Sequence, residues 1–191
     1  MQEINNLKGM LLIAMPTLKD ETFGHSVIYI CEHNKDGAMG LILNATLDGL
    51  TLGEVLSSVQ DLCREEITLT HLTQQISYGG PVQQERGFVL HTGKKKWLSS
   101  TKLDKNLTLT VSKDLLQILG TSLEPKQYRV FLGYSGWEAG QLEQEIAENS
   151  WLLVPLDADL IFNTPAEDLW EIAVSKLGIN SCQLSHQTGY A

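Results

Sequence analysis

The feature that most constrains the fold is a strand–turn–strand pattern in the first quarter of the chain. The stretch Ser26–Glu32 is rich in β-branched and aromatic residues, which favour strands. His33–Gly37 ends in an Asp-Gly pair, which tolerates the positive φ angles of tight hairpin turns. Ala38–Asn44 is again mostly apolar and supplies the return strand. The pattern therefore predicts an antiparallel hairpin.

Further strands are predicted by short apolar runs and by alternation of apolar and polar residues. They lie at Met10–Ala14, Ile76–Tyr78, Arg86–Thr92, Leu107–Val111, Tyr128–Leu132 and Trp151–Val154. The alternation within Leu107–Val111 predicts a half-buried strand. Gly133–Trp137 is expected to end the strand before it, because a glycine-rich turn lets a strand bend sharply into a helix.

Four helices are predicted between these strands. Thr51 and Glu54 form a capping box, in which each residue satisfies the backbone amide of the other. Thr164–Glu167 combines a cap, a proline at the first helical position and a reciprocal glutamate, so a helix is expected to run to about Leu177. The other two are placed at Ser112–Gly120 and Gln141–Asn149. Such irregular interleaving predicts an α+β fold.

The length of 191 residues fits one domain covering residues 1–191, with residues 1–6 and 180–191 as loose termini. Three widely spaced cysteines argue against a disulfide framework or a zinc site and fit a reducing compartment. The start of the chain does not resemble a signal peptide, and the longest apolar run, Met10–Met15, is too short to span a bilayer. We therefore expect a cytoplasmic protein that does not insert into membranes.

The formal net charge of −9 disfavours direct binding to nucleic acid, which depends on cations that neutralise phosphates. Lys94–Lys96 is the one short basic run. Five histidines show no metal-ligand spacing, and no nucleotide-binding glycine motif occurs, so no metal and no cofactor are predicted. His33 is expected in an exposed turn and His91 in a packed strand.

Two glycine-rich corners are the strongest candidates for a binding site. Gly133–Gly136 resembles a nucleophile elbow, but its second glycine comes one residue early, so Ser135 is not predicted to be catalytic. No other residue is predicted to be catalytic. Gly79–Val82 fixes a tight backbone path just before Arg86. If the corners meet, they could frame a cleft; the candidate binding residues are Gly79, Gly80, Arg86, Ser135, Trp137 and Gln141. In the alternative interpretation, Arg86 only pairs with a structural acid.

Several segments in a fixed order together resemble the AlgH/YqgE family of bacterial proteins, from Leu7 to about Gly178. They are Gly9–Pro16, Ser26–Tyr29, Gly40–Asn44, Gly79–Val82, Arg86–His91, Gly133–Trp137 and Gly140–Glu143. Glu138 departs from the pattern, since a small residue is expected there. The resemblance implies a mixed, largely antiparallel sheet that splits and curls into a pseudo-barrel with helices packed outside. It implies no catalytic residues, and some members of the family are labelled transcriptional regulators.

Two functions follow from these observations. The first is a non-enzymatic regulator or adaptor that acts through contacts with another protein, and that influences transcription indirectly if at all. The second is a small-molecule-binding protein or an enzyme of unrecognised type, with a cleft framed by the Gly79-Gly80-Pro81 and Gly133–Gly136 corners. The absence of a complete catalytic motif favours the first.

Overall fold

The computed structural model describes residues 6–58, 72–93 and 95–178. The predicted loose termini lie outside these ranges, except for Asn6. Cys63, Lys94 and Cys182 also lie outside them. The strands are β1 Met10–Ala14, β2 Val27–Asn34, β3 Gly37–Ile42, β4 Thr46–Thr51, β5 Gln75–Tyr78, β6 Val82–Thr92, β7 Ser100–Lys102, β8 Leu107–Thr110, β9 Tyr128–Glu138 and β10 Trp151–Pro155. The described helices are α1 Leu52–Ser58, α3 Lys113–Leu116, α4 Gln141–Ala147, α5 Ala158–Phe162 and α6 Leu169–Ser175. None of them is long and apolar enough to cross a bilayer.

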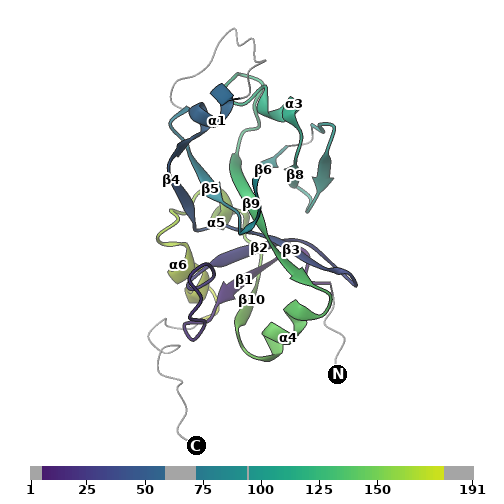
Figure 1. Cartoon of the computed structure of the whole chain (residues 1–191), viewed down its shortest axis with the longest axis vertical. Coiled ribbons are helices and arrows are strands. Elements are labelled where there is room, and N and C mark those ends of the chain that lie inside the picture. Colours follow the sequence, from purple (N-terminus) through teal and green to yellow (C-terminus); the bar gives the residue numbers. More distant parts are fainter. Residues whose placement is uncertain (1–5, 59–71, 94, 179–191) are drawn as a thin grey trace, which may run out of the picture.

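The strands form one curled sheet with the order β10-β1-β2-β3-β9-β6-β8-β7, and β4 and β5 extend it as a branch from β9. All described pairings are antiparallel except β5 with β9. Figure 1 shows β9 running lengthwise through the molecule, with β4, β5, β6 and β8 around its first half and β1, β2, β3 and β10 around its second half. The predicted α+β class with a curled, largely antiparallel sheet is confirmed.

β9 changes partners at Gly133. Before this residue β9 pairs with β5 and β6, and from Ser135 onward it pairs with β3. Gly133 has a φ of +70°, and a Cβ placed there would lie 2.3 Å from the Gly80 carbonyl oxygen. A Cβ on Gly79 would lie 2.2 Å from the Gly133 carbonyl oxygen. The sheet can therefore split and curl only because glycines let the two backbones touch.

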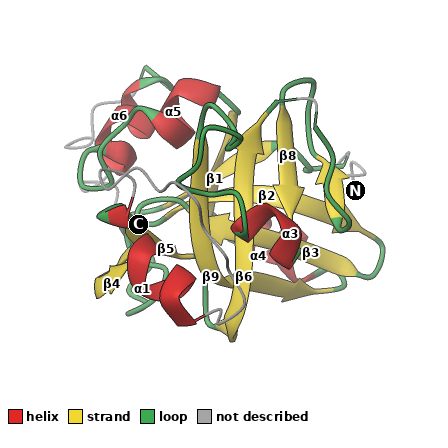
Figure 2. Cartoon of the chain, turned by 90° about the horizontal axis from the view of Figure 1, so that it is seen from above, coloured by secondary structure: helices red, strands yellow, loops and turns green. Residues whose placement is uncertain are grey.

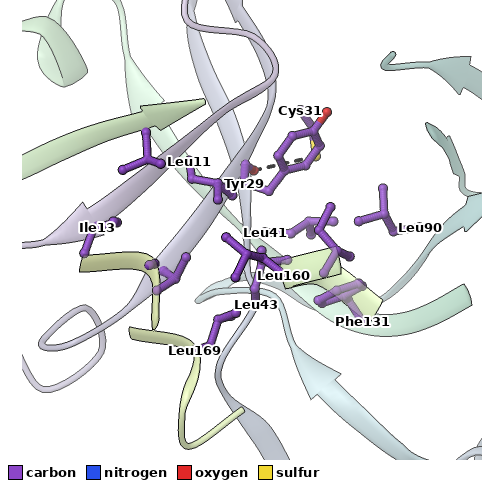
Figure 3. Close-up of a cluster of buried hydrophobic side chains, with 14 of the residues drawn as sticks. Leu11, Ile13, Tyr29, Cys31, Leu41, Leu43, Leu90, Phe131, Leu160 and Leu169 are labelled. Carbon is purple, nitrogen blue, oxygen red and sulfur yellow. Dashed lines mark hydrogen bonds between the residues drawn. The ribbon is translucent and has the colours of Figure 1, made fainter. Parts of the chain in front are cut away.

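Three apolar clusters stabilise the fold. The largest fills the inside of the curl and extends beneath α5 and α6; it includes Tyr29, Leu41, Phe131 and Leu169 (Figure 3). A second cluster lies beneath α4, and a third lies beneath α1 and α3. Figure 2 shows α5 and α6 side by side next to β1, at one flank of the sheet. The short helices thus cover faces and ends of the sheet that would otherwise expose apolar side chains.

Local sequence signals were accurate where neighbouring residues determine the structure. The predicted hairpin is confirmed, with β2 and β3 paired from Ile28–Ile42 to Asn34–Gly37. The capping box is also confirmed: the Thr51 amide donates to Glu54 Oε2 at 2.7 Å, and the Glu54 amide donates to Thr51 Oγ1 at 3.4 Å.

Three predictions of local structure were wrong. Gly133–Trp137 does not end a strand but continues β9, because its backbone finds a second partner in β3. The last helix starts at Leu169 and not at Pro165, since the first buried residues are Leu169 and Trp170, and packing of a buried face is what stabilises a short helix. Leu107–Thr110 is buried on both faces rather than half-buried.

Helix and strand extents differ in smaller ways. The helix predicted over Ser112–Gly120 is limited to α3 and a following turn. β4, β7 and α5 carry no sequence signal strong enough to predict them. β4 and β7 are held by pairing with the next strand along the chain, β4 with β5 and the three residues of β7 with β8.

A buried polar chain lies between β6, β7 and β8. His91 has no exposed surface, and its Nε2 lies 2.8 Å from Thr110 Oγ1, which lies 2.7 Å from Ser100 Oγ. His91 Nδ1 is 3.3 Å from the Thr92 carbonyl oxygen, which can only accept. Nδ1 therefore carries a proton, and in the neutral ring Nε2 accepts from the Thr110 hydroxyl. Burial lowers the pKa of His91, although the Thr92 carbonyl opposes the shift.

Replacing Gly133 by alanine is expected to destabilise the protein severely. The change adds the cost of a left-handed alanine, about 1–2 kcal/mol, to the clash with the Gly80 carbonyl, about 1–3 kcal/mol. Gly49→Ala is the matched control, because Gly49 also has a positive φ, +75°, but has nothing within 4 Å of the added Cβ. Urea unfolding monitored by tryptophan fluorescence should show a much larger loss for Gly133→Ala. Equal losses would contradict the proposed role of the backbone contact.

Acid should destabilise the fold through His91. Because the folded-state pKa of His91 is lowered, the unfolded chain binds the proton more readily, and stability falls as pH drops below about 6.5. The slope from this one group cannot exceed about 1.4 kcal/mol per pH unit. Urea unfolding of wild type and His91→Gln at pH 7.5 and 5.5 should show a smaller loss on acidification for the variant. An identical loss in both proteins would exclude this residue as the source.

Candidate functional site

A groove of about 640 Å³ lies on the concave side of the curl. Its lining residues come from six neighbouring strands, β2, β3, β9, β6, β8 and β7. These strands form a half-barrel that is open between β2 and β7. Its lining includes Leu109 of β8 and Asp36 at the tip of the β2–β3 hairpin. The curl imposed at Gly133 is therefore what creates this groove.

The floor of the groove is apolar and aromatic. Phe88 and Tyr134 meet edge to face, with ring centroids 5.7 Å apart and planes at 69°. Around them lie four further apolar side chains, none of which is fully buried: Met39, Leu103, Val111 and Val82. Partly exposed apolar side chains gathered in a concave surface are typical of a binding site.

Arg86 covers part of this floor. Its guanidinium carbon lies 5.5 Å from the centre of the Phe88 ring, in the geometry of a cation–π contact. Its Nη1 donates to Gln83 Oε1 at 3.1 Å. The alternative prediction, a structural ion pair with an acid, does not match this geometry among the described residues. Arg86 is exposed and its long side chain can move away from the ring, which would uncover apolar surface.

The rim of the groove is acidic. Three exposed carboxylates, those of Glu32, Asp36 and Glu138, line it, against the single cation Arg86. Glu138 belongs to the end of β9, at the position where the family pattern predicts a small residue. The rim therefore carries a net charge of −2, from three negative charges and one positive, and attracts cationic groups.

Cys31 lies in the floor but does not offer a reactive thiolate. Its side chain is 2% exposed, and burial raises the pKa of the thiol far above its ordinary value. Only the thiolate is a good nucleophile. Cys31 therefore packs as a small apolar residue of the main cluster.

Trp137 forms a wall of the groove and is held from behind by helix α4. The indole N–H groups of Trp137 and Trp151 both donate to Glu145 Oε2, at 2.9 and 2.8 Å. Gln141 Nε2 donates to Glu145 Oε1 at 2.9 Å, and Gln141 Oε1 accepts from the Glu138 amide at 2.9 Å. Gln141 thus supports the groove from outside and does not line it.

His33 fixes the same helix to β2. The prediction of an exposed turn was wrong, because β2 continues through His33 and its side chain is 7% exposed. Nε2 lies 2.9 Å from Glu143 Oε1 on α4, and Nδ1 accepts from the Leu7 amide at 3.1 Å. A backbone donor on Nδ1 requires the proton of the neutral ring to be on Nε2, facing the carboxylate.

The six predicted binding residues fall into two groups. Gly79, Gly80 and Ser135 meet at the junction beside Gly133, where Ser135 is fully buried and its Oγ donates to the Gly79 carbonyl oxygen at 3.2 Å. This group lies within the wall and does not line the groove. Arg86 and Trp137 line it, and Gln141 supports it.

Sequence reasoning missed most of the groove. Its aromatic floor and acidic rim come from strands that are distant in sequence and become neighbours only through the curl. One signal was available: Arg86 and Phe88 are two residues apart on a strand, and therefore share a face. Among the described residues, no three histidine, cysteine or acidic side chains are grouped so that they could hold a metal ion.

Comparisons with known proteins agree with this architecture. Residues 11–182 match the model of the AlgH-like family. A UPF0301 protein of Vibrio vulnificus is 50% identical over 187 residues, covering 97% of this chain and all of the relative, and one of Vibrio cholerae is 49% identical over the same length.

Two solved structures share the fold. The solution structure of the AlgH protein from Pseudomonas aeruginosa is 39% identical with a TM-score of 0.79, covering 100% of this chain and 99% of that one. A crystal structure of a Corynebacterium diphtheriae protein, 23% identical with a TM-score of 0.73, covers 97% of this chain and 94% of that one, and shows the fold alone. The chain belongs to the AlgH-like, UPF0301 family.

Proposed function

We propose that this protein is a non-enzymatic adaptor that binds a segment of another protein in the groove of the half-barrel. The observation that carries the proposal is the combination of an apolar, aromatic floor with an acidic rim in one open groove. Apolar floor residues supply affinity when water is displaced from them, and rim charges select and steer the partner. The partner segment is therefore apolar with flanking lysine or arginine side chains.

The shape of the groove favours a polypeptide over a compact molecule. Small-molecule sites enclose most of their ligand, commonly in 300–1,000 Å³. This groove has a volume in that range, about 640 Å³, but exposed residues of β2 and β7 border it on opposite sides. An elongated segment could lie along the groove and leave at both ends.

A regulatory role in transcription would then be indirect and cytoplasmic. The chain carries a formal net charge of −9, and the groove rim is itself acidic. Both features repel phosphate backbones. Any effect on gene expression would thus pass through a protein partner held in the groove.

The second candidate function is binding of a small organic cation in the same groove. It is supported by the groove volume and by the partly exposed Tyr134 ring, since aromatic faces attract cations. In this version the site lies beside the two glycine corners and not between them. A thermal-shift screen of small cations against wild type and Tyr134→Leu separates it from peptide binding.

The adaptor proposal is tested by screening a display library of random peptides for those that bind the full-length protein. Selected peptides should contain apolar residues with lysine or arginine. The triple variant Glu32→Gln, Asp36→Asn, Glu138→Gln should bind them about tenfold more weakly, because each rim charge contributes roughly 0.5 kcal/mol. Fluorescence anisotropy of labelled peptides measures the dissociation constants.

The matched control is Glu167→Gln, Asp168→Asn, Glu171→Gln. It removes the same charge from exposed positions at the start of α6 that do not line the groove. Its affinity should stay within about twofold of wild type, since exposed charges far from the site are screened. The adaptor proposal fails if no peptide is enriched, or if both triple variants lose affinity equally.

A further inference from the structure

In the part of the chain that the structure describes, β7 is the last strand of the sheet and pairs with β8 alone. Its ladder with β8 aligns Ser100 with Thr110 and Lys102 with Thr108. The Val111 amide donates to the Ser99 carbonyl, and the Leu103 amide donates to the Leu107 carbonyl. Residues 99 and 103 therefore direct these backbone groups toward β8. Because backbone groups alternate sides along a strand, Thr101 also faces β8, whereas Ser100 and Lys102 face away from it.

The outward edge of β7 is largely free. Within the described ranges, no residue bonds to the N–H or C=O of Ser100 or to the N–H of Lys102. The Lys102 carbonyl accepts a long bond, 3.4 Å, from the exposed Lys8 Nζ. An edge with unpaired donors and acceptors is a template for another strand.

This edge faces the opening of the groove. Thr101 lines the groove, and on the opposite side the described part of β2 beyond Ile30 pairs with β3 alone. The segment before β1 contacts both strands, since Lys8 Nζ donates to the Lys102 carbonyl of β7 and the Gly9 amide donates to the Ile30 carbonyl of β2. Among the described residues, no strand joins β7 to β2, so the half-barrel is open along this edge.

We propose that the partner segment binds as an extended strand added to the outer edge of β7. The inference rests on the proposed function and specifies its mode of binding and its ligand class. Side chains of a strand alternate between faces, so one set would contact the aromatic floor and the other would face the rim and solvent. The acidic rim matches lysine or arginine in the second set. The ligand is therefore an extended polypeptide in which apolar residues alternate with basic ones.

The test removes one outward donor without touching the ladder to β8. Lys102→Pro deletes the outward N–H, and proline is tolerated on an edge strand when its missing donor faces away from the sheet. Lys102→Ala is the matched control, because it removes the same side chain and keeps the donor. The probe is a fluorescein-labelled ten-residue peptide of alternating valine and lysine, with an alternating valine–glutamate peptide as charge control.

Lys102→Ala should bind the valine–lysine peptide at least as tightly as wild type in fluorescence anisotropy, because it keeps the outward donor and removes a like charge beside the bound lysines. Lys102→Pro should bind it about fivefold more weakly than Lys102→Ala, the effect of losing one backbone hydrogen bond. The valine–glutamate peptide should bind at least about tenfold more weakly than the valine–lysine peptide. Circular dichroism and thermal unfolding establish that each variant is folded.

Hydrogen exchange of the wild type gives a second measurement that needs no variant. The amides of Ser100 and Lys102 should exchange more slowly in NMR spectra at saturating valine–lysine peptide. Equal affinity of Lys102→Ala and Lys102→Pro, or unchanged exchange at both amides, would overturn strand addition. If strand addition fails, the adaptor proposal is still decided by its own test, which is whether library peptides lose affinity for the rim triple variant.

Discussion

The contact between two backbones at Gly79–Gly80 and Gly133 governs the rest of the structure. A Cβ at any of these positions would lie within 2.4 Å of a backbone atom of the other segment. The Gly79 amide donates to the Leu132 carbonyl, while its carbonyl accepts from the Ile42 amide. This one residue thus joins β9 to β3, and the sheet turns around it. Val82, two residues after Gly80, and Tyr134, directly after Gly133, already line the groove.

The sequence was sufficient for the features that a few neighbouring residues determine. The hairpin around Asp36-Gly37 and the Thr51–Glu54 cap are examples, because turn and cap geometry involve three or four consecutive residues. Gly133 was misread because a positive φ serves both a turn and a kinked strand, and only the distant partner β3 distinguishes them. The family resemblance supplied the curled sheet that local patterns could not.

Of the candidate binding residues, Arg86 and Trp137 line the groove, whereas Ser135 and the two glycines lie at the backbone junction behind it. The acidic residues of the rim could not be predicted from the sequence. Exposed carboxylates are common, and these three become neighbours only in the folded chain. The groove is also well supported from behind. Glu145 accepts both tryptophan indoles, and Glu143 contacts His33, so α4 is joined to β2, β9 and β10 by polar contacts. Such support keeps a binding surface close to its bound shape before the partner arrives.

The late position of β9 in the chain has a consequence for how this protein is made. Its residues 128–138 are needed by β3, β5 and β6, all of which emerge from the ribosome earlier. The β10 partner of β1, residues 151–155, is synthesised later still. Most strand pairs therefore connect distant parts of the sequence, which slows folding and leaves strand edges uncovered during synthesis. The apolar strand edges of the nascent chain therefore stay unpaired until one late strand joins both halves of the sheet.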